Sequence, residues 1–352
     1  MKICNIGKII TTKVDGTTLT RDNYISTENM LSNCGGVIAS SSVPSTKVTR
    51  FYKHDVLLSN IRPYFKKVWF ARFDGGCSND VICIRADEKN CLSQYLYYAL
   101  STDKFIDGFS ASSKGTKMPR GDKNALLSYE ISDRTIDEQQ HIVDILGSID
   151  NSIENNEKFV ANLETYAISK YQEITKGISD FITLGEIVDI YDSKREPLSS
   201  RERESRKGNY RYYGATGVLD YVNDYLFDGE YVLLAEDGTV IDENGYPIVQ
   251  LVTGQFWVNN HAHIMQAKAG YTNYSLYVAL KKLSVNTAVT GAVQLKINKA
   301  NLCALEMPRM DENKLLTFNQ EIEPLFLKII HIRAEIEKLK ELKHLYLNKF
   351  FD

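Results

Sequence analysis

Apolar residues recur in alternating steps of four and three along two stretches of the chain, 142–163 and 322–339. The positions in phase are Ile142, Leu146, Ile149, Ile153, Asn156, Val160 and Leu163, and then Ile322, Leu325, Ile329, Ile332, Ile336 and Leu339. This alternation is typical of a coiled-coil seam. It predicts one long helix over residues 136–178 and another over 312–352. The helices are antiparallel if the chain folds back to pack one seam on the other; alternatively, each pairs with another molecule.

Two residues interrupt these helix patterns. Asn156 occupies a seam position, where a buried amide costs stability but sets the register of the helices. The alternative is that Asn156 lies where solvent reaches the seam. Pro324 lacks a backbone N–H and crowds the preceding turn, so we expect a kink or a new helix start there.

The remaining regions, 1–135 and 179–311, alternate short β-type runs with turn signals. Runs such as "KVWFARF" and "YVLLAE" are rich in β-branched and aromatic residues and predict strands. Turns such as "DGG" and "ENG" separate them. Helices are expected over 92–105 and 273–283. Each region is therefore predicted to be an α+β domain with short strands.

The same features appear twice, about 176 residues apart, which is half of the 352-residue chain. The run "VLL" from Val56 falls on "VLL" from Val232, and the segment from Gly115 falls on the segment from Gly291. The order of the features and the phase of the helices repeat together, which indicates an internal duplication. The predicted architecture is α+β, with two similar domains and two long helices that form an antiparallel coiled coil.

Length and composition fit this architecture. A chain of 352 residues is long enough for two domains, and 25% charged and 43% hydrophobic residues are typical of a soluble globular protein. No window approaches about 18 consecutive apolar residues, so no membrane span is expected. The first residues lack the features of a signal peptide. Six cysteines without a C-x-x-C pair indicate reduced thiols in a cytosolic protein and no zinc site.

Charge is unevenly distributed around the net value of −3. Residues 1–75 have 11 Lys and Arg against 5 Asp and Glu, a net +6, whereas residues 137–175 have 2 against 8, a net −6. A basic region beside an acidic helix is typical of a protein that contacts phosphate with one surface and protein with another. The alternative is an ordinary solvated surface.

Motifs for catalysis or nucleotide binding are missing from the sequence. The chain has no glycine-rich cofactor turn, no methyltransferase tetrapeptide of the form Asn/Asp-Pro-Pro-aromatic and no G-x-x-x-x-G-K-[ST]. His261 and His263 alternate as strand residues do and lack further ligands nearby, so hydrogen bonding or packing is favoured over metal binding. We predict no catalytic residue, no cofactor and no metal site in this chain.

Several motifs in combination resemble those of the specificity (S) subunit of type I restriction-modification systems. In the second half they are "YYGATGVLDYVNDYLFDGEYVLLAEDG", "GQFWVNNHAHIMQ" and "GAVQLKINKANLCALEMP". In the first half they are "YISTENM", "VLLSNIRPYFKKVW", "GCSNDVICIRA" and "DEQQHIVDILGSID". The resemblance covers essentially the whole chain, and Pro324 in the distal helix is its main departure.

The resemblance implies two target-recognition domains, 1–135 and 179–311, with a central spacer helix over 136–178 and a distal one over 312–352. Such a subunit binds a bipartite double-stranded DNA target and docks two modification subunits, which bring S-adenosylmethionine and methylate adenine. It does no chemistry itself and acts in the cytoplasm. Whether restriction or translocase subunits join is left open. The alternative is a stand-alone, repeat-built DNA-binding or scaffold protein without a methyltransferase partner.

Candidate DNA-contacting residues are basic, amide, hydroxyl or aromatic side chains in the predicted loops. They are Lys13, Arg21, Asn60, Arg62, Lys66, Lys67, Lys114, Lys117, Arg120, Lys194, Arg195, Tyr212, Tyr213, Thr216, Thr290, Gln294 and Lys296.

Three of these sets have specific expectations. Arg62, before the rigid Pro63, is expected to read or flank a base, while Lys66 and Lys67 bind phosphate; the alternative is a solvated basic strand end. Gln294 has the side chain for a bidentate adenine contact. Tyr212 and Tyr213 are alternatively core aromatics, the commoner place for a tyrosine pair.

Overall fold

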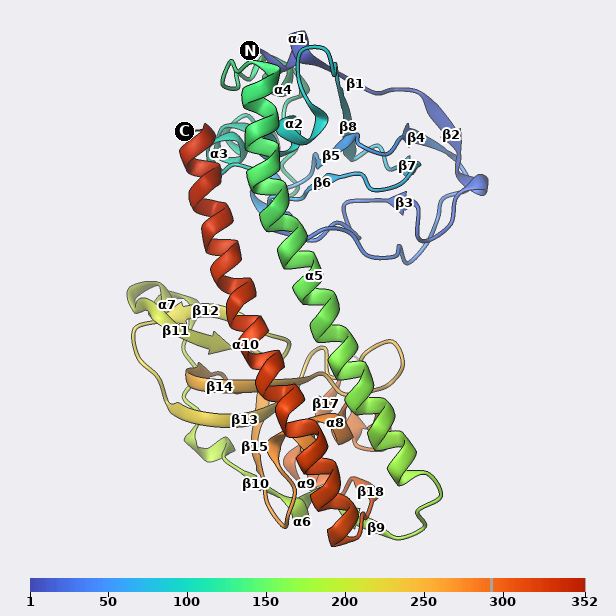
Figure 1. The fold of residues 1–352 in the computed structure, drawn as a ribbon, viewed down its shortest axis with the longest axis vertical. Helices are drawn as coiled ribbons and strands as arrows, with labels where there is room; N and C mark the ends of the chain where they lie inside the picture. The colour runs from blue at the N-terminus through green and yellow to red at the C-terminus, as the bar shows by residue number, and fades with distance from the viewer. Residues whose placement is uncertain (292–293, 352) are drawn as a thin grey trace. The chain divides into compact units, whose positions relative to one another are not determined.

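The computed structural model describes residues 1–291 and 294–351 and divides into two compact units. Unit 1 consists of residues 1–155 and 336–352, and unit 2 of residues 156–335. The long helices α5 (Ile136–Thr175) and α10 (Glu312–Phe351) each contribute one part to both units (Figure 1). No helix of the described residues is both long and apolar enough to cross a membrane.

Unit 1 contains two four-stranded sheets, in the orders β1-β8-β5-β6 and β2-β4-β7-β3. Their strands are β1 (Gly7–Ile9), β2 (Lys13–Asp15), β3 (Tyr24–Ile25), β4 (Lys47–Phe51), β5 (Val56–Ser59), β6 (Val68–Phe70), β7 (Gly75–Cys77) and β8 (Val81–Ala86). The helices are α1 (Ile3–Ile6), α2 (Ser93–Leu100), α3 (Asp103–Ala111) and α4 (Lys123–Ser128), with 3-10 turns η1 (Gly16–Thr18) and η2 (Pro63–Phe65).

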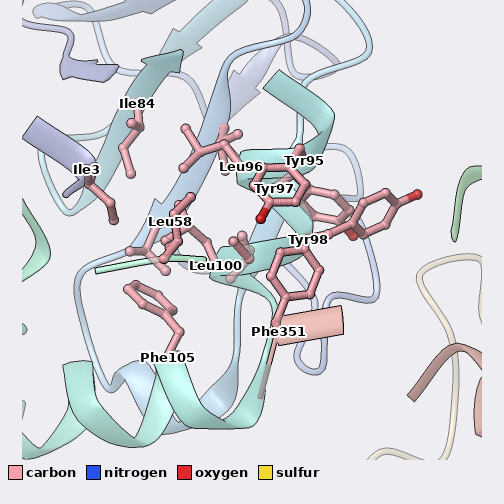
Figure 2. Packing of buried hydrophobic residues seen from close by; sticks show 14 of the residues in the cluster. Ile3, Leu58, Ile84, Tyr95, Leu96, Tyr97, Tyr98, Leu100, Phe105 and Phe351 are labelled. Carbon is pink, nitrogen blue, oxygen red and sulfur yellow. The ribbon is translucent and has the colours of Figure 1, made fainter. Parts of the chain in front are cut away.

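The larger hydrophobic cluster of unit 1 lies between the first sheet and the helices. All four residues of β5 are buried, which explains its continuous apolar run. Figure 2 shows Leu58 and Ile84 of the sheet near Tyr95 of α2 and Phe351 of α10. The Phe351 ring lies 5.1 Å from that of Tyr95, so the last turn of the chain belongs to the core of the N-terminal unit.

Unit 2 contains one six-stranded sheet in the order β10-β15-β13-β14-β11-β12 and two small two-stranded sheets. Its strands are β9 (Phe181–Thr183), β10 (Val188–Ile190), β11 (Lys207–Tyr213), β12 (Val218–Val222), β13 (Phe227–Ala235), β14 (Val249–Val258), β15 (Ala262–Ala267), β16 (Val289–Thr290), β17 (Lys296–Ile297) and β18 (Glu306–Pro308). The helices are α6 (Leu184–Ile187), α7 (Ser200–Ser205), α8 (Asn273–Leu280) and α9 (Lys299–Cys303), with the 3-10 turn η3 (Asp192–Lys194).

The repeat extends to strand pairing. In unit 1, Val56 of β5 pairs with Ile84 of the antiparallel β8, and in unit 2, Val232 of β13 pairs with Met265 of the antiparallel β15. In each unit a buried helix, α2 or α8, follows the second of these strands. The predicted helix over 92–105 is wrong in one respect: it breaks into α2 and α3, because Thr102 accepts a hydrogen bond from the Phe105 N–H and caps a new helix.

Residue pairs within unit 2 show that α5 and α10 run antiparallel, as the sequence predicted. Glu164 of α5 lies 2.7 Å from Arg333, Tyr166 donates to Glu321 at 2.6 Å, and the ring of Tyr171 lies 5.9 Å from that of Phe318. Successive residues of α5 therefore contact progressively earlier residues of α10.

The predicted seam residues differ in burial. The buried ones are Ile142, Leu146, Ile149, Val160, Ile322, Ile329, Ile332 and Ile336, and those of intermediate exposure are Ile153, Asn156, Leu163, Leu325 and Leu339. Phe326, outside the predicted seam, is fully buried because its ring packs on Tyr274 and Tyr277 of α8. A helix that packs on both a helix and a domain buries a wider face than a seam alone.

Pro324 does not start a new helix, because α10 runs without a break from Glu312 to Phe351. Proline has no N–H, so the carbonyl of Gln320, four residues before Pro324, has no helical donor. Both residues are exposed. Solvent can therefore hydrate this carbonyl and lower the cost of the proline.

An acid of α5, a tyrosine of the domain and a base of α10 meet in each unit. In unit 1, Tyr98 donates to Asp150 at 2.9 Å and Lys343 lies 2.6 Å from the same carboxylate. In unit 2, Glu164 accepts from Tyr277 at 3.0 Å and from Arg333 at 2.7 Å. Glu164 and Arg333 therefore face each other and join both helices to α8.

Candidate nucleic-acid interface

Two loops of unit 1 meet beside the end of β5 and carry many of the predicted DNA-contacting residues. The Arg62 N–H donates to the carbonyl of Pro119 at 2.8 Å, and the Gly121 N–H donates to that of Asn60 at 3.1 Å. The backbones of Lys114 and Arg120 exchange two hydrogen bonds, which close the second loop. The structure thus brings together residues that are more than 50 positions apart in the sequence.

Local backbone geometry explains how the first loop presents its residues. Arg62 has φ 47° and ψ 64° and Lys66 has φ 53° and ψ 45°, so both lie in the left-handed region on either side of η2. Gly121 must be glycine, because a Cβ there would lie 2.1 Å from the ring of Phe109. This close approach holds the second loop against α3.

The loop cluster has a basic and partly apolar exterior. Lys114, Lys117 and Arg120 are exposed, although Lys114 lies 3.3 Å from Asp122 and Arg120 2.9 Å from Asp80. The Arg62 guanidinium is loosely held, 3.4 Å from the carbonyl of Lys117. Tyr64, Phe65 and Met118 expose large apolar areas beside these cations. We call Arg62, Lys114, Lys117 and Arg120 the basic loop cluster.

Two predicted phosphate ligands, Lys66 and Lys67, are bound to acceptors of the protein. Lys66 lies 2.7 Å from Asp103, and this bond holds the pKa of the Asp103 carboxyl below its usual value. Lys67 donates to the carbonyl of Thr27 at 2.6 Å, and burial lowers the pKa of its ammonium. Their contact with phosphate stays a prediction, but it requires breaking these bonds.

The other predicted residues of unit 1 differ in position. Asn60 is buried, and its Oδ1 has no hydrogen-bond partner among the described residues. Lys13 donates to Thr49 and to Asn79, the neighbour of the Asp80 that binds Arg120. Arg21 donates to the carbonyl of Ser41 at 2.6 Å.

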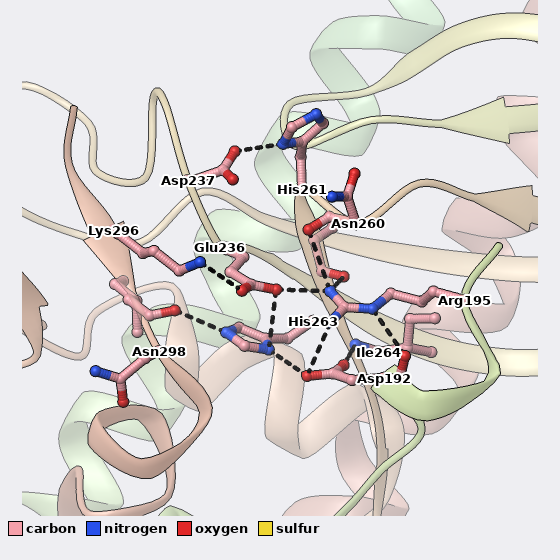
Figure 3. A network of polar contacts seen from close by, with 12 residues as sticks. Asp192, Arg195, Glu236, Asp237, Asn260, His261, His263, Ile264, Lys296 and Asn298 are labelled. Carbon is pink, nitrogen blue, oxygen red and sulfur yellow. Dashed lines mark hydrogen bonds and ion pairs between the residues drawn. The ribbon is translucent and has the colours of Figure 1, made fainter. Parts of the chain in front are cut away.

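In unit 2 a network of charged groups connects η3, β13, β15 and β17 (Figure 3). Arg195 donates to Glu236 at 2.6 Å and to the carbonyl of Ala262 at 2.9 Å. Lys296 lies 3.2 Å from the second oxygen of Glu236, and His263 Nδ1 lies 2.6 Å from Asp192. Two predicted DNA-contacting residues, Arg195 and Lys296, are therefore joined through one carboxylate, although 101 residues separate them.

The network keeps its carboxylates charged. Burial alone would raise the pKa of Asp192, but bonds from His263, the Ile264 N–H and Arg195 outweigh it and lower the value. The same balance lowers the pKa of Glu236, with Arg195 and Lys296 as donors. Asp192, Glu236 and His263 place ligand atoms within 4.8 Å of one another. However, Nε2 of His263 lies 2.8 Å from the Ile297 carbonyl and both carboxylates have cationic partners, so the arrangement fits an ion-pair network better than a metal site.

Most other predicted residues of unit 2 fall into the core or onto exposed loops. Tyr212 and Tyr213 are buried in two hydrophobic clusters, so the alternative reading as core aromatics describes their position. Lys194 is exposed and its Nζ lies 5.0 Å from the ring centre of Tyr191. Thr290 and Gln294 are exposed, and Thr290 donates to the carbonyl of Lys296 at 3.1 Å.

An open hollow of about 450 Å³ lies beside this network and was not anticipated as a whole. Its walls are residues 214–219, 237–239, Asn259 and His261, and they include one predicted residue, Thr216. His261 Nδ1 lies 2.6 Å from Asp237. The sequence signal was present in "NNHAH", but the partners of these side chains come from strands that pair only in the fold. The basic stretch 201–211 was likewise missed; within it, Arg203 and Lys207 both bind Asp220.

Comparison with known proteins shows what the chain resembles. The family model described as the type I restriction modification DNA specificity domain matches residues 2–165 and again residues 179–343. Specificity subunit S.HindORF215P of Haemophilus influenzae is 39% identical over 125 residues, which are 36% of this chain and 31% of that protein. The type I restriction enzyme MjaIX specificity subunit of Methanocaldococcus jannaschii is 24% identical over 296 residues, 73% of this chain and 68% of that protein.

Other matches agree in kind. The EcoDI specificity subunit of Escherichia coli is 27% identical over 155 residues, 44% of this chain and 33% of that protein. The matched part thus spans about a third of the H. influenzae and E. coli relatives. The crystal structure of the S subunit of a type I restriction-modification system from M. genitalium has a TM-score of 0.56 and 16% identity, and the match covers 100% of this chain and 95% of that chain. That similarity concerns the fold.

Proposed function

Because the chain belongs to the type I restriction modification DNA specificity family, we propose that it selects the DNA target of a type I restriction-modification complex. Each unit contains one recognition domain, and each domain reads one half of a bipartite double-stranded target. The observation that carries this proposal is the double match of the family model, over residues 2–165 and 179–343.

The basic loop cluster is the part of unit 1 best suited to DNA. Exposed Lys and Arg side chains beside exposed aromatic residues combine phosphate binding with contact to bases and sugars. Its loops are closed by their own backbone hydrogen bonds, so less conformational entropy is lost on binding than in a free loop. In unit 2, the hollow and the surrounding Thr216, Thr290, Gln294 and Lys296 take the corresponding part.

The chain acts without catalysis of its own under this proposal. Methylation of adenine with S-adenosylmethionine is the work of two modification subunits that dock on this chain. Helices α5 and α10 offer charged outer faces for them, and the duplicated sequence provides two similar docking surfaces for two identical partners. The complex works on DNA in the cytoplasm.

Two linked recognition domains give higher sequence specificity than a single domain. Each base pair that is read contributes about 1–3 kcal/mol of discrimination, and tethering makes the second encounter effectively intramolecular. A bipartite target is the expected result.

Methylome sequencing of the host, with and without the gene for this chain, tests the proposal. We expect one bipartite methylated motif to disappear with the chain and to return with a plasmid copy. A methylome that is unchanged by the deletion contradicts it. Copurification distinguishes the alternative: a stand-alone DNA-binding or scaffold protein elutes without a methyltransferase.

A further inference from the structure

The hollow of unit 2 contains a buried amide whose donor has no partner in the described part of the chain. Asn259 is 6% exposed and lines the hollow. The His261 N–H donates to its Oδ1 at 2.8 Å, which assigns the two atoms of the amide and leaves Nδ2 directed elsewhere. Nδ2 is not among the fully buried side-chain atoms that lack a partner, so a ligand in the hollow can reach this donor.

His261 offers the complementary group at the same hollow. Its side chain is 47% exposed, and Nδ1 lies 2.6 Å from Oδ1 of Asp237. A carboxylate can only accept, so in the neutral ring Nδ1 carries the hydrogen and Nε2 is an acceptor. Figure 3 shows the Asp237–His261 pair next to the charged network. The hollow therefore presents one donor and one acceptor on side chains that are two residues apart.

The walls of the hollow are already in place. The Gly214 N–H donates to the carbonyl of Gly217 at 2.8 Å, and Gln250 Nε2 donates to the carbonyls of Gly214 and Ala215. Next to Asp237, the Glu236 N–H donates to the carbonyl of His261, and the Gly238 N–H to that of Leu295. A site held in this way needs little reorganisation on binding.

We propose that Asn259 and His261 read an adenine of the second half-site from the major groove, with Asp237 as the residue that positions the His261 ring. This inference rests on the proposed function. Among the four bases, only adenine presents an acceptor, N7, beside a donor, N6–H₂, in that groove. Asn259 Nδ2 donates to N7, and His261 Nε2 accepts from N6. Guanine presents two acceptors and does not match.

The rim of the hollow distinguishes the base pair further. Val218 and Leu219 line it and are exposed, without the burial that normally explains such side chains. Apolar side chains recognise the methyl group of thymine, which lies on the same groove edge as the paired adenine. This contact favours an A·T pair over a C·G pair, because cytosine lacks the methyl group. In a C·G pair, moreover, the donor and the acceptors of the major groove lie on different bases.

The test is binding selection from a pool of randomised DNA duplexes with the full-length chain in the complex that copurifies from its host. The wild-type complex is expected to enrich a bipartite motif with an adenine in the half-site that belongs to unit 2. Asn259→Ala and His261→Ala should each reduce the preference for that one adenine about 5- to 150-fold. The other half-site should stay unchanged and thereby report a folded chain.

Further variants separate positioning from a structural role. Asp237→Ala should weaken the preference for the same adenine. Asp237→Asn should retain more of this preference, because its amide oxygen still accepts from Nδ1 of His261. The control is His344→Ala, which removes another His–Asp pair outside the hollow, with Nδ1 of His344 3.7 Å from Asp103. It should change the base preference at no position of the motif. Unchanged adenine preference in the Asn259 and His261 variants, or loss at a different base, overturns the proposal. A wild-type complex that enriches no motif contradicts the proposed function itself.

Discussion

Individual side chains of the candidate interface differ in how strongly the protein itself holds them. Lys66, Lys67 and Arg195 have protein acceptors within 2.7 Å, whereas Lys117 is exposed and its ammonium group has no hydrogen-bond acceptor among the described residues. A cation that is already paired must give up that partner before it binds phosphate, so its net contribution is smaller. The loosely held residues are therefore the better candidates for DNA contact.

Lys117→Ala should weaken DNA binding to all sequences alike and reduce the slope of log affinity against log salt by about 1, because one released counterion is lost. Titrations of a labelled duplex at several salt concentrations measure this. Lys89→Ala, an exposed lysine outside the basic loop cluster, is the matched control. Equal slopes for wild type and Lys117→Ala would remove Lys117 from the phosphate contacts.

Glu236→Gln should lower the free energy of unfolding at pH 7 by about 2 kcal/mol, since it removes the charge that Arg195 and Lys296 bind. The pKa of Glu236 is lowered in the folded state. Its stabilisation is therefore present above the unfolded value of about 4.3 and disappears as the pH falls through the folded pKa. Denaturant unfolding from pH 7 to pH 3 should show the wild type and the variant converging at acid pH. A difference that stays constant with pH contradicts this.

Among the secondary-structure elements, α5 and α10 have two packing partners rather than one. Each helix packs on the other helix, and each is also attached to a domain, through Asp150 in unit 1 and through Glu164, Arg333 and Phe326 in unit 2. Burial of the Tyr277 hydroxyl, next to Glu164, raises its pKa, so the tyrosine remains a donor to that carboxylate. The helix pair is thus part of the domain core and not a separate rod.

A double-mutant cycle of Glu164→Ala and Arg333→Ala should give a coupling energy of about 1 kcal/mol, a moderate value because the Arg333 side chain is 41% exposed. Urea unfolding of the four proteins provides the measurement. Glu323→Ala, an exposed acid on the same helix, is the control and should change stability by less than about 0.5 kcal/mol. Strict additivity of the two single variants would show that the pair contributes nothing of its own.

At the scale of the whole molecule, sequence order and structural units do not coincide. Unit 1 combines the first 155 residues with residues 336–352, so the N-terminal domain is incomplete without the C-terminal part of α10. Leu347 and Phe351 belong to its hydrophobic core, and Lys343 pairs with its Asp150. The two halves of the chain are therefore similar in sequence but exchange parts of their helices.

Phe351→Ala should destabilise unit 1 by about 3 kcal/mol, because it leaves a cavity against Tyr95. Hydrogen exchange of the full chain should show faster exchange of the α2 amides, with little change in α8. Leu345→Ala, on the exposed face of the same helix, is the control. If the substitution leaves the protection of the α2 amides unchanged, Phe351 does not contribute to the stability of the hydrophobic core of unit 1.

The sequence by itself determined the periodic parts of this protein. Steps of four and three predicted α5 and α10, and a shared offset of about 176 residues predicted the two similar α+β domains. Such patterns are readable because each apolar position reports the burial of a regular element, whatever its distant neighbours are. The same locality explains what the patterns did not show: Phe326 lies outside the helical seam and is buried by α8, and Tyr212 and Tyr213 are buried in hydrophobic clusters of unit 2.

Only the tertiary structure decided which polar residues come together. Arg195 meets Lys296 through Glu236, which follows β13 where that strand pairs with β15. Asn259 meets the turn at 214–217 because β14 pairs with β11. No local sequence pattern encodes contacts between strands that lie far apart along the chain. Whether a Lys or Arg is free for DNA or bound to a carboxylate depends on those contacts, so the composition of the site could be read from the sequence but its geometry could not.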